Sequence, residues 1–134
     1  MDYLQHFKKI LDTTIKENAS DLIISVNHPP TIRVTGQLIP LVKEKKVTSE
    51  DCKNLAFSLM PEYKKNKLLT EKEIDFSYDF DGKVRFRVNV FFQRGNISVA
   101  MRLIPSNIRT FEELNLPAVL HEFAKKNQGL LLVT

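Results

Sequence analysis

Alternating apolar and polar positions in the middle of the chain predict an antiparallel sheet. Over residues 73–80 every second side chain is apolar, and the positions between them are acidic or small and polar. Residues 84–90 and 97–103 continue the same alternation. A period of two residues is typical of a strand that buries one face. Turn-forming residues separate the three segments, so we expect three consecutive strands joined by hairpins.

Apolar spacings of three and four residues predict helices on both sides of these strands. Thr48 and Asp51 have the spacing of a capping box, with Asp in place of the usual Glu or Gln, and so mark a helix start. Proline is favoured in a first helical turn, as at Pro61 and Pro117. The predicted helices are residues 2–18, 48–60, 61–69 and 117–126, with a helical turn at 111–116.

Short β-branched or apolar segments predict further strands near both ends of the chain. Residues 21–26 and 31–34 are separated by a rigid Asn-His-Pro-Pro turn. Residues 130–133 are a continuous apolar run after Gly129, which is typical of a strand buried on both faces. The fold class that this order predicts is α/β (α+β), an antiparallel sheet flanked by helices.

The pairing register of the hairpins follows from the requirement that apolar side chains share one face. If Arg94 and Gly95 form the tight turn of the second hairpin, Arg87 lies directly opposite Arg102. If the turn is Gly95-Asn96 instead, the two arginines become diagonal neighbours on the same face. Either turn brings both guanidinium groups within reach of one anion.

The same requirement, that apolar side chains share one face, excludes a two-residue loop at Asp81-Gly82 in the first hairpin. A three-residue or bulged connection places Asp79 opposite Arg85 and Ser77 opposite Arg87. Arg85 therefore has an acidic partner, and we interpret Asp79 and Arg85 as structural residues.

Charge is segregated along the chain, although composition is ordinary. The chain has 134 residues, 43% of them hydrophobic and 27% charged, and a net charge of +4, as expected for one folded domain. Five of the six arginines lie in residues 83–110, which contain no Asp or Glu. Like charges opposite each other destabilise a sheet by up to about 1 kcal/mol. The pairing of Arg87 with Arg102 therefore predicts that an anion such as phosphate binds there.

Several functional classes are disfavoured by the remaining residues. Cys52 is the single cysteine, so there is no internal disulfide, and the three histidines lack metal-ligand spacing, so we expect no metal site. No apolar run is long enough to span a membrane and no signal peptide precedes the first helix, so a cytosolic protein is expected. The strand aromatics fall on the face opposite the arginines, which argues against nucleic-acid binding.

Six segments together resemble the amino-terminal domain of PilT-type ATPases, the retraction motors of type IV pili within the secretion-ATPase superfamily. The segments are ASDL at 19–22, HPPTIRVTG at 28–36, IDFS at 74–77, RFRVN at 85–89, RLIP at 102–105 and GLLLVT at 129–134. They are spread over nearly the whole chain and follow the family's order. One departure is Ile23, where relatives often have His.

The resemblance implies a PAS-like domain over residues 1–110, followed at 111–134 by a linker helix and the first strand of a RecA-like ATPase domain. It also implies that Arg87 and Arg102 are arginine fingers that contact nucleotide phosphates. No G-x-x-x-x-G-K-[ST] motif is present, so we expect this chain alone not to hydrolyse ATP.

For the full-length protein the resemblance implies ATP and Mg²⁺ as cofactors and a homo-hexamer on the cytoplasmic side of the inner membrane. The implied partner there is the pilus platform protein, without membrane insertion. Two other readings stay open: a pilus-assembly or type II secretion ATPase, and a stand-alone PAS-like sensor module.

Overall fold

The computed structural model describes residues 2–82 and 84–134 and divides the chain into two compact units, Met1–Ile104 and Pro105–Thr134. The first unit contains the sheet and its helices, and the second contains one short helix. The domain limits predicted from the resemblance, 1–110 and 111–134, stay a prediction.

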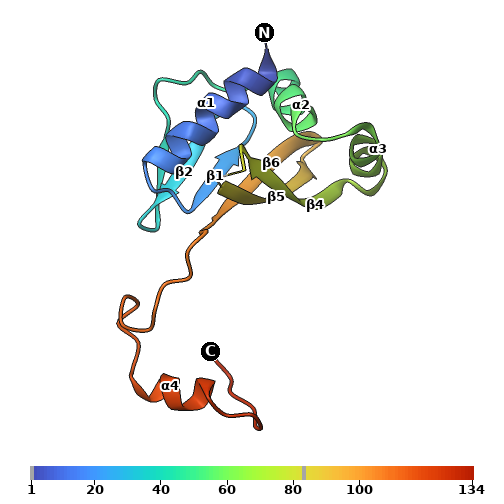
Figure 1. The fold of residues 1–134 in the computed structure, drawn as a ribbon. Helices are drawn as coiled ribbons and strands as arrows, with labels where there is room; N and C mark the ends of the chain where they lie inside the picture. Colours follow the sequence, from blue (N-terminus) through green and yellow to red (C-terminus); the bar gives the residue numbers. More distant parts are fainter. Residues whose placement is uncertain (1, 83) are drawn as a thin grey trace. The chain divides into compact units, whose positions relative to one another are not determined.

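The first unit is built on a six-stranded sheet in the order β3-β2-β1-β6-β5-β4 (Figure 1). All neighbouring strands are antiparallel. The strands are β1 (Asp21–Ile24), β2 (Thr31–Val34), β3 (Gln37–Pro40), β4 (Glu73–Phe80), β5 (Val84–Gln93) and β6 (Asn96–Ile104). The predicted antiparallel sheet is confirmed, and β3 is a strand that the sequence pattern did not predict.

Three helices accompany the sheet: α1 (Tyr3–Lys16), α2 (Ser49–Ser58) and α3 (Glu62–Glu71). Helices α1 and α2 lie on one side of the sheet, and α3 leads into the edge strand β4 (Figure 1). The predicted capping box is confirmed, because the Thr48 hydroxyl accepts a hydrogen bond from the Asp51 amide and the Asp51 carboxylate accepts one from the Thr48 amide. None of the helices in residues 2–82 and 84–134 is both long and apolar enough to cross a bilayer.

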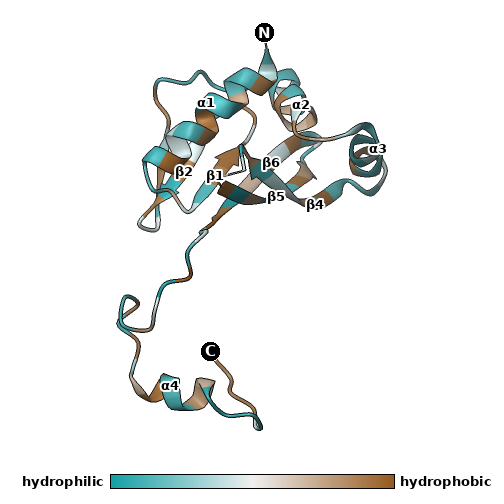
Figure 2. Ribbon diagram, in the orientation of Figure 1, coloured by the Kyte–Doolittle hydropathy of each residue, from teal (hydrophilic) through white to brown (hydrophobic). Residues whose placement is uncertain are grey.

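The core lies between the sheet and helices α1 and α2. Leu22, Phe86 and Met101, from three adjacent strands, are almost completely buried together with Phe7 of α1. Apolar and polar residues are interleaved along α1 and the strands in Figure 2. Since side chains alternate along a strand, the neighbours of these buried residues point away from the helices. That open face carries the candidate site.

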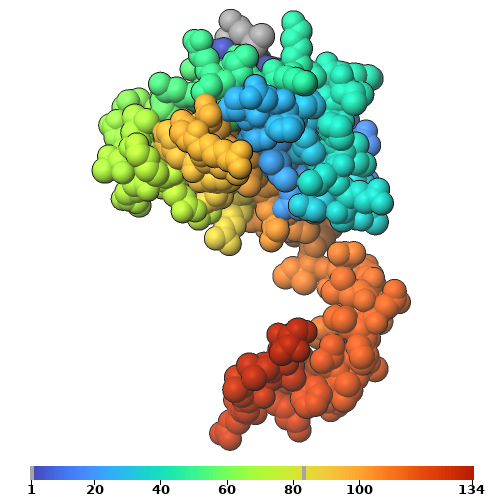
Figure 3. Space-filling view, turned by 180° about the vertical axis from the view of Figure 1, so that it is seen from behind, coloured from blue at the N-terminus to red at the C-terminus, as the bar shows by residue number. Residues whose placement is uncertain are grey.

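Behind the first unit as drawn in Figure 1, the segment after β1 lies beside the β5–β6 turn (Figure 3). Both segments line one small hollow, which includes Asn27 and Arg94. Arg94 and Gly95 both have positive φ, 50° and 78°, as a two-residue type I′ hairpin turn requires. The Arg94-Gly95 alternative is therefore the turn that forms.

The second unit differs from its prediction. Its helix α4 (Val119–Ala124) is shorter than the predicted 117–126, and residues 111–115 form a hydrogen-bonded turn. The predicted buried strand at 130–133 is wrong, because these residues have no strand pairing and their side chains are exposed. A strand needs neighbouring strands for its ladder of hydrogen bonds, and the described part of the chain pairs none with this segment.

Candidate functional site

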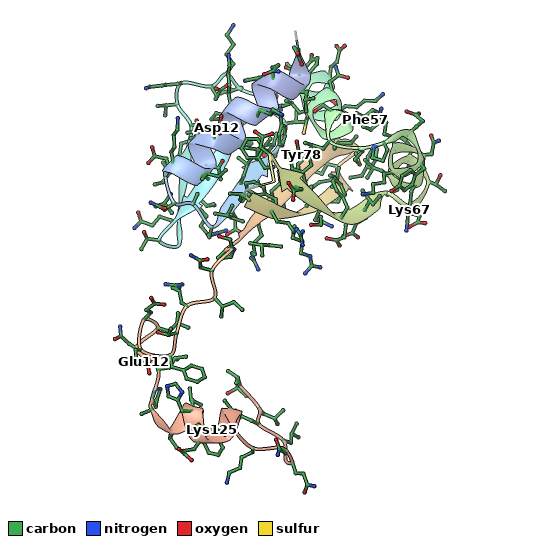
Figure 4. All side chains as sticks on the ribbon, in the orientation of Figure 1. Asp12, Phe57, Lys67, Tyr78, Glu112 and Lys125 are labelled. Atoms are coloured by element: carbon green, nitrogen blue, oxygen red, sulfur yellow. The ribbon has the colours of Figure 1, made fainter. Side chains whose placement is uncertain are left out.

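Five residues from five strands form one row across the open face of the sheet. The register pairs Asp21 with Arg33 on one side and with Arg102 on the other, Arg102 with Arg87, and Arg87 with Ser77. Figure 4 shows side chains with nitrogen at their ends projecting from the sheet on the side away from α1 and α2. We call these residues the arginine row.

The next row lies beside it and leaves space above the sheet. Ile23, Ala100, Asn89 and Asp75 are successive cross-strand partners in this row. Ala100 is the smallest of them, and a solvent-open hollow of 430 Å³ lies over both rows. The hollow is lined by Asp21, Ile23, Arg33, Glu73, Asp75, Arg87, Asn89, Ala100, Met101 and Arg102.

Arg102 is bonded to Asp21, which lies between two arginines. The Nε atom of Arg102 donates to Asp21 Oδ1 at 3.0 Å, and Arg33 Nε lies 3.3 Å from Asp21 Oδ2. The Ser20 hydroxyl also donates to Oδ2, at 2.7 Å. Burial acts to raise the pKa of Asp21, but the hydrogen bonds from Ser20 and Arg102 and the charges of both arginines outweigh it, so this pKa lies below its ordinary value.

Arg87 has a weaker acidic neighbour on the outer strand. Its Nε atom lies 3.6 Å from Asp75 Oδ1, beyond hydrogen-bond distance, and the two side chains are 72% and 50% exposed. Glu73, the third carboxylate around the hollow, accepts a hydrogen bond from Asn89 at 2.9 Å. The side chain of Arg102 is 73% exposed, so both arginines present most of their surface to solvent.

The structure confirms the register predicted for the first hairpin and selects the direct alternative for the second. Arg87 lies directly opposite Arg102, and Asp79 lies opposite Arg85. Asp79 Oδ1 accepts a hydrogen bond from the Gly82 amide at 2.7 Å. No ion pair joins Asp79 to Arg85 among the residues that the structure describes. The structural roles of Asp79 and Arg85 stay a prediction, and Lys83, the third residue of the predicted connection, lies outside the described residues.

This arrangement can bind an anion that has several oxygen atoms. Each guanidinium uses Nε toward a carboxylate, and the planar fork formed by the two terminal nitrogens is the part that recognises phosphate or carboxylate oxygens. Two forks that come from adjacent strands can contact one such anion from two directions. The rigid sheet holds both positions, so no loop has to move to create the pair.

Two residues of the arginine row were missed by sequence reasoning. Asp21 and Arg33 reach the row because β1 pairs with β6, a contact between residues 81 positions apart. The alternation of side chains predicts which residues of a strand share a face, but it does not predict which distant strands are neighbours. The available signal was local: Asp21 and Arg33 lie at polar positions within short β-branched strands.

The chain is similar to type IV pilus ATPases. It is 32% identical over 126 residues to the type IV pilus ATPase PilU and 34% identical over 130 residues to the type IV pilus retraction ATPase PilT, both from Pseudomonas aeruginosa. Each match covers 94% of this chain. The chain spans about a third of the length of these relatives, 33% and 36% respectively.

Solved structures show the same fold. A crystal structure of the pilus retraction motor PilT with bound ADP matches 89% of this chain and 35% of that one, with a TM-score of 0.75 and 32% identity. The Legionella pneumophila ATPase DotB matches 94% of this chain and 36% of its own, with a TM-score of 0.64 and 26% identity. No protein-family model matches the chain.

Proposed function

We propose that this chain, which corresponds to the amino-terminal domain of PilT-type ATPases, supplies the phosphate-binding arginines of a hexameric motor that retracts type IV pili. The observation that carries the proposal is the direct opposition of Arg87 and Arg102 on the exposed face of the sheet. Like charges in this position are unfavourable unless anions lie near them, and Asp75 and Asp21 approach only the Nε atoms, so the exposed terminal nitrogens can still take an anion. The phosphates of ATP fit that requirement.

The residues fit the phosphate groups of a nucleotide. Arg87 and Arg102 would bind oxygens of the terminal phosphate, where negative charge redistributes during hydrolysis. A planar fork fixed on a strand stabilises that charge with little reorganisation. ATP, when bound, supplies the phosphoryl group that is transferred to water, and these two arginines hold and neutralise it.

The other parts of the ATPase site belong, in this proposal, to the rest of the full-length protein. The sequence has no Walker A motif, so the remaining phosphate contacts and Mg²⁺ would be supplied outside these 134 residues. We therefore propose that the chain alone does not hydrolyse ATP. The full-length protein would act in the cytoplasm at the inner membrane, as a homo-hexamer that contacts the pilus platform protein.

The decisive experiment measures ATP hydrolysis by full-length protein that carries Arg87→Ala or Arg102→Ala. Loss of one such charge-stabilising donor reduces kcat by roughly 10²-fold or more in comparable sites. Arg87→Lys should also be impaired, because a point charge does not replace the bidentate fork. Arg94→Ala, at the hairpin turn, is the matched control and should keep wild-type kcat. Wild-type kcat in both alanine variants would refute the finger assignment.

The biological role is tested by the phenotype of cells that lack the gene. A retraction motor predicts surface pili that no longer retract, with loss of twitching. Loss of the pili themselves would favour an assembly motor instead. One relative is named a retraction ATPase, and the name of the other does not say whether it retracts or assembles pili. The test therefore distinguishes members of one family.

A further inference from the structure

We propose that Asp21 is a positioning residue that fixes Arg102, whereas Arg87 is held only loosely by Asp75 and moves from that carboxylate to the phosphate. This inference rests on the proposed function, because it assigns unequal tasks to the two arginines of that site. Arg102 would be the fixed contact and Arg87 the exchangeable one.

Asp21 is placed to fix Arg102 from the neighbouring strand. It is the Cα partner of Arg33 and Arg102 at once, and its side chain is only 16% exposed. One carboxylate oxygen accepts from Arg102 Nε at 3.0 Å, while the other contacts Ser20 Oγ at 2.7 Å and Arg33 Nε at 3.3 Å. Both oxygens are thus engaged, and the orientation of the carboxylate is determined on both sides.

Arg33 extends this chain of contacts to the β2–β3 turn. Its Nη1 atom donates to the carbonyl oxygen of Gly36 at 3.2 Å, while its Nε atom faces Asp21. The contacts therefore run from the turn through Arg33 and Asp21 to Arg102, across three adjacent strands. A side chain held in this way has lost rotamer freedom before its ligand arrives, which lowers the entropy cost of binding.

Arg87 lacks such support. Its contact with Asp75 is 3.6 Å long, and Asp75 is 50% exposed, compared with 16% for Asp21. Asp75 is not the cross-strand partner of Arg87, which is Ser77. An ion pair this exposed contributes little, so an incoming phosphate can replace Asp75 at small cost. Asp75 then acts as a competitor for Arg87 rather than as a support.

The test compares Asp21→Asn with Asp75→Asn in the full-length ATPase. Asp21→Asn should lower kcat by about tenfold or more, because small misplacements of a catalytic group are costly, and should leave KM for ATP nearly unchanged. Asp75→Asn should leave kcat within about twofold and lower KM, since the competitor is gone. Glu71→Gln, which removes an exposed carboxylate paired with Lys67 on α3, is the control and should change neither value.

A double variant shows whether Asp21 acts through Arg102. If it does, Asp21→Asn combined with Arg102→Ala should have the kcat of Arg102→Ala alone. Additive losses would overturn the inference, and so would a kcat for Asp21→Asn equal to or above that of the wild type. If Arg102→Ala itself keeps full activity, the proposed function fails instead, so the two failures are distinguishable.

A second measurement does not depend on activity. In ¹⁵N-labelled wild-type chain, the Arg102 Nε–H should exchange with water more slowly than the Arg87 Nε–H, because only Arg102 donates a short hydrogen bond. In Asp21→Asn the Arg102 signal should exchange as fast as that of Arg87. Equal exchange rates of the two groups in the wild-type chain would overturn the inference.

Discussion

Arg87 and Arg102 are direct cross-strand partners, and each is neutralised by a carboxylate from a different strand. Asp75 lies beside Arg87 and Asp21 beside Arg102, so the two arginines share no acid. Opposed like charges cost a sheet roughly 0.2–1 kcal/mol, and exposed ion pairs contribute a similar amount. The arrangement is therefore close to neutral for stability.

Removal of Arg87 should accordingly have little effect on folding. We expect Arg87→Gln to change the free energy of unfolding of this chain by less than about 0.5 kcal/mol, because relief of the repulsion offsets the lost Asp75 contact. Urea unfolding followed by circular dichroism measures this. Val88→Ala on the same strand is the control, and its buried side chain should cost on the order of 2 kcal/mol. A loss above 1 kcal/mol for Arg87→Gln would make Arg87 a structural residue.

The contribution of Asp21 to stability should disappear in acid. Its pKa in the folded chain lies below the ordinary value of 3.8, so the unfolded chain binds the proton first as pH falls. The stabilisation is fully present above that value and is lost as pH falls through the lower pKa of the folded state. Asp21→Asn should thus be less stable than wild type by about 1 kcal/mol at pH 7, and the difference should close toward pH 2. A constant difference across this range would contradict the ion-pair explanation.

The capping box of α2 should stabilise the first unit measurably. Thr48 Oγ1 accepts from the Asp51 amide at 3.1 Å, and Asp51 Oδ2 accepts from the Thr48 amide at 3.2 Å. Thr48→Ala should therefore lower the free energy of unfolding by about 1 kcal/mol. Glu50→Ala, in the same turn, removes only an interaction with the helix dipole and should cost a few tenths, about 0.3 kcal/mol. Equal losses in the two variants would show that the cap itself contributes nothing.

The single thiol should be unreactive in the folded protein. Burial raises the pKa of Cys52 to about 11, and its Sγ atom lies 2.8 Å from the carbonyl oxygen of Ile97. Since the thiolate is the reactive form, this pKa alone lowers reactivity roughly 100-fold relative to an ordinary thiol. Iodoacetamide labelling at pH 8, followed by mass spectrometry, should be slow in buffer and rapid in 8 M urea, about the denaturant level that unfolds small domains. Equally rapid labelling in buffer would mean that α2 does not cover the thiol.

The hairpins were predictable because their information is local. The alternation in residues 73–103 determines which side chains share a face, and the positive-φ turn at Arg94 and Gly95 determines the register. The alternation alone placed Arg87 and Arg102 on one face as direct or diagonal neighbours, and the turn seen in the structure selects the direct pairing. Asp21 could not be placed in this way, because its contact with Arg102 depends on a pairing of distant strands.

The failures occurred where a segment lacks a local pattern. Strand β3 is exposed along its whole length, and Pro40 interrupts its short apolar stretch, so no alternation marks it. Residues 130–133 show the opposite case: the apolar run predicts a buried strand, yet Leu130 and Val133 are 85% and 90% exposed. Apolar composition makes burial favourable, but only neighbouring strands can supply the hydrogen-bond ladder.

The strand order also has a consequence for how the chain folds. Strands β1, β2 and β3 are consecutive, as are β4, β5 and β6, so each half of the sheet can form from contacts between near neighbours in sequence. Among the strand pairings that the structure describes, β1–β6 alone joins the halves. It closes a loop of about 80 residues, so we expect it to be the slow and entropically costly event. Asp21 meets Arg102 at that junction. Mutations along this junction, where the arginine row is completed, should therefore slow folding more than they speed unfolding.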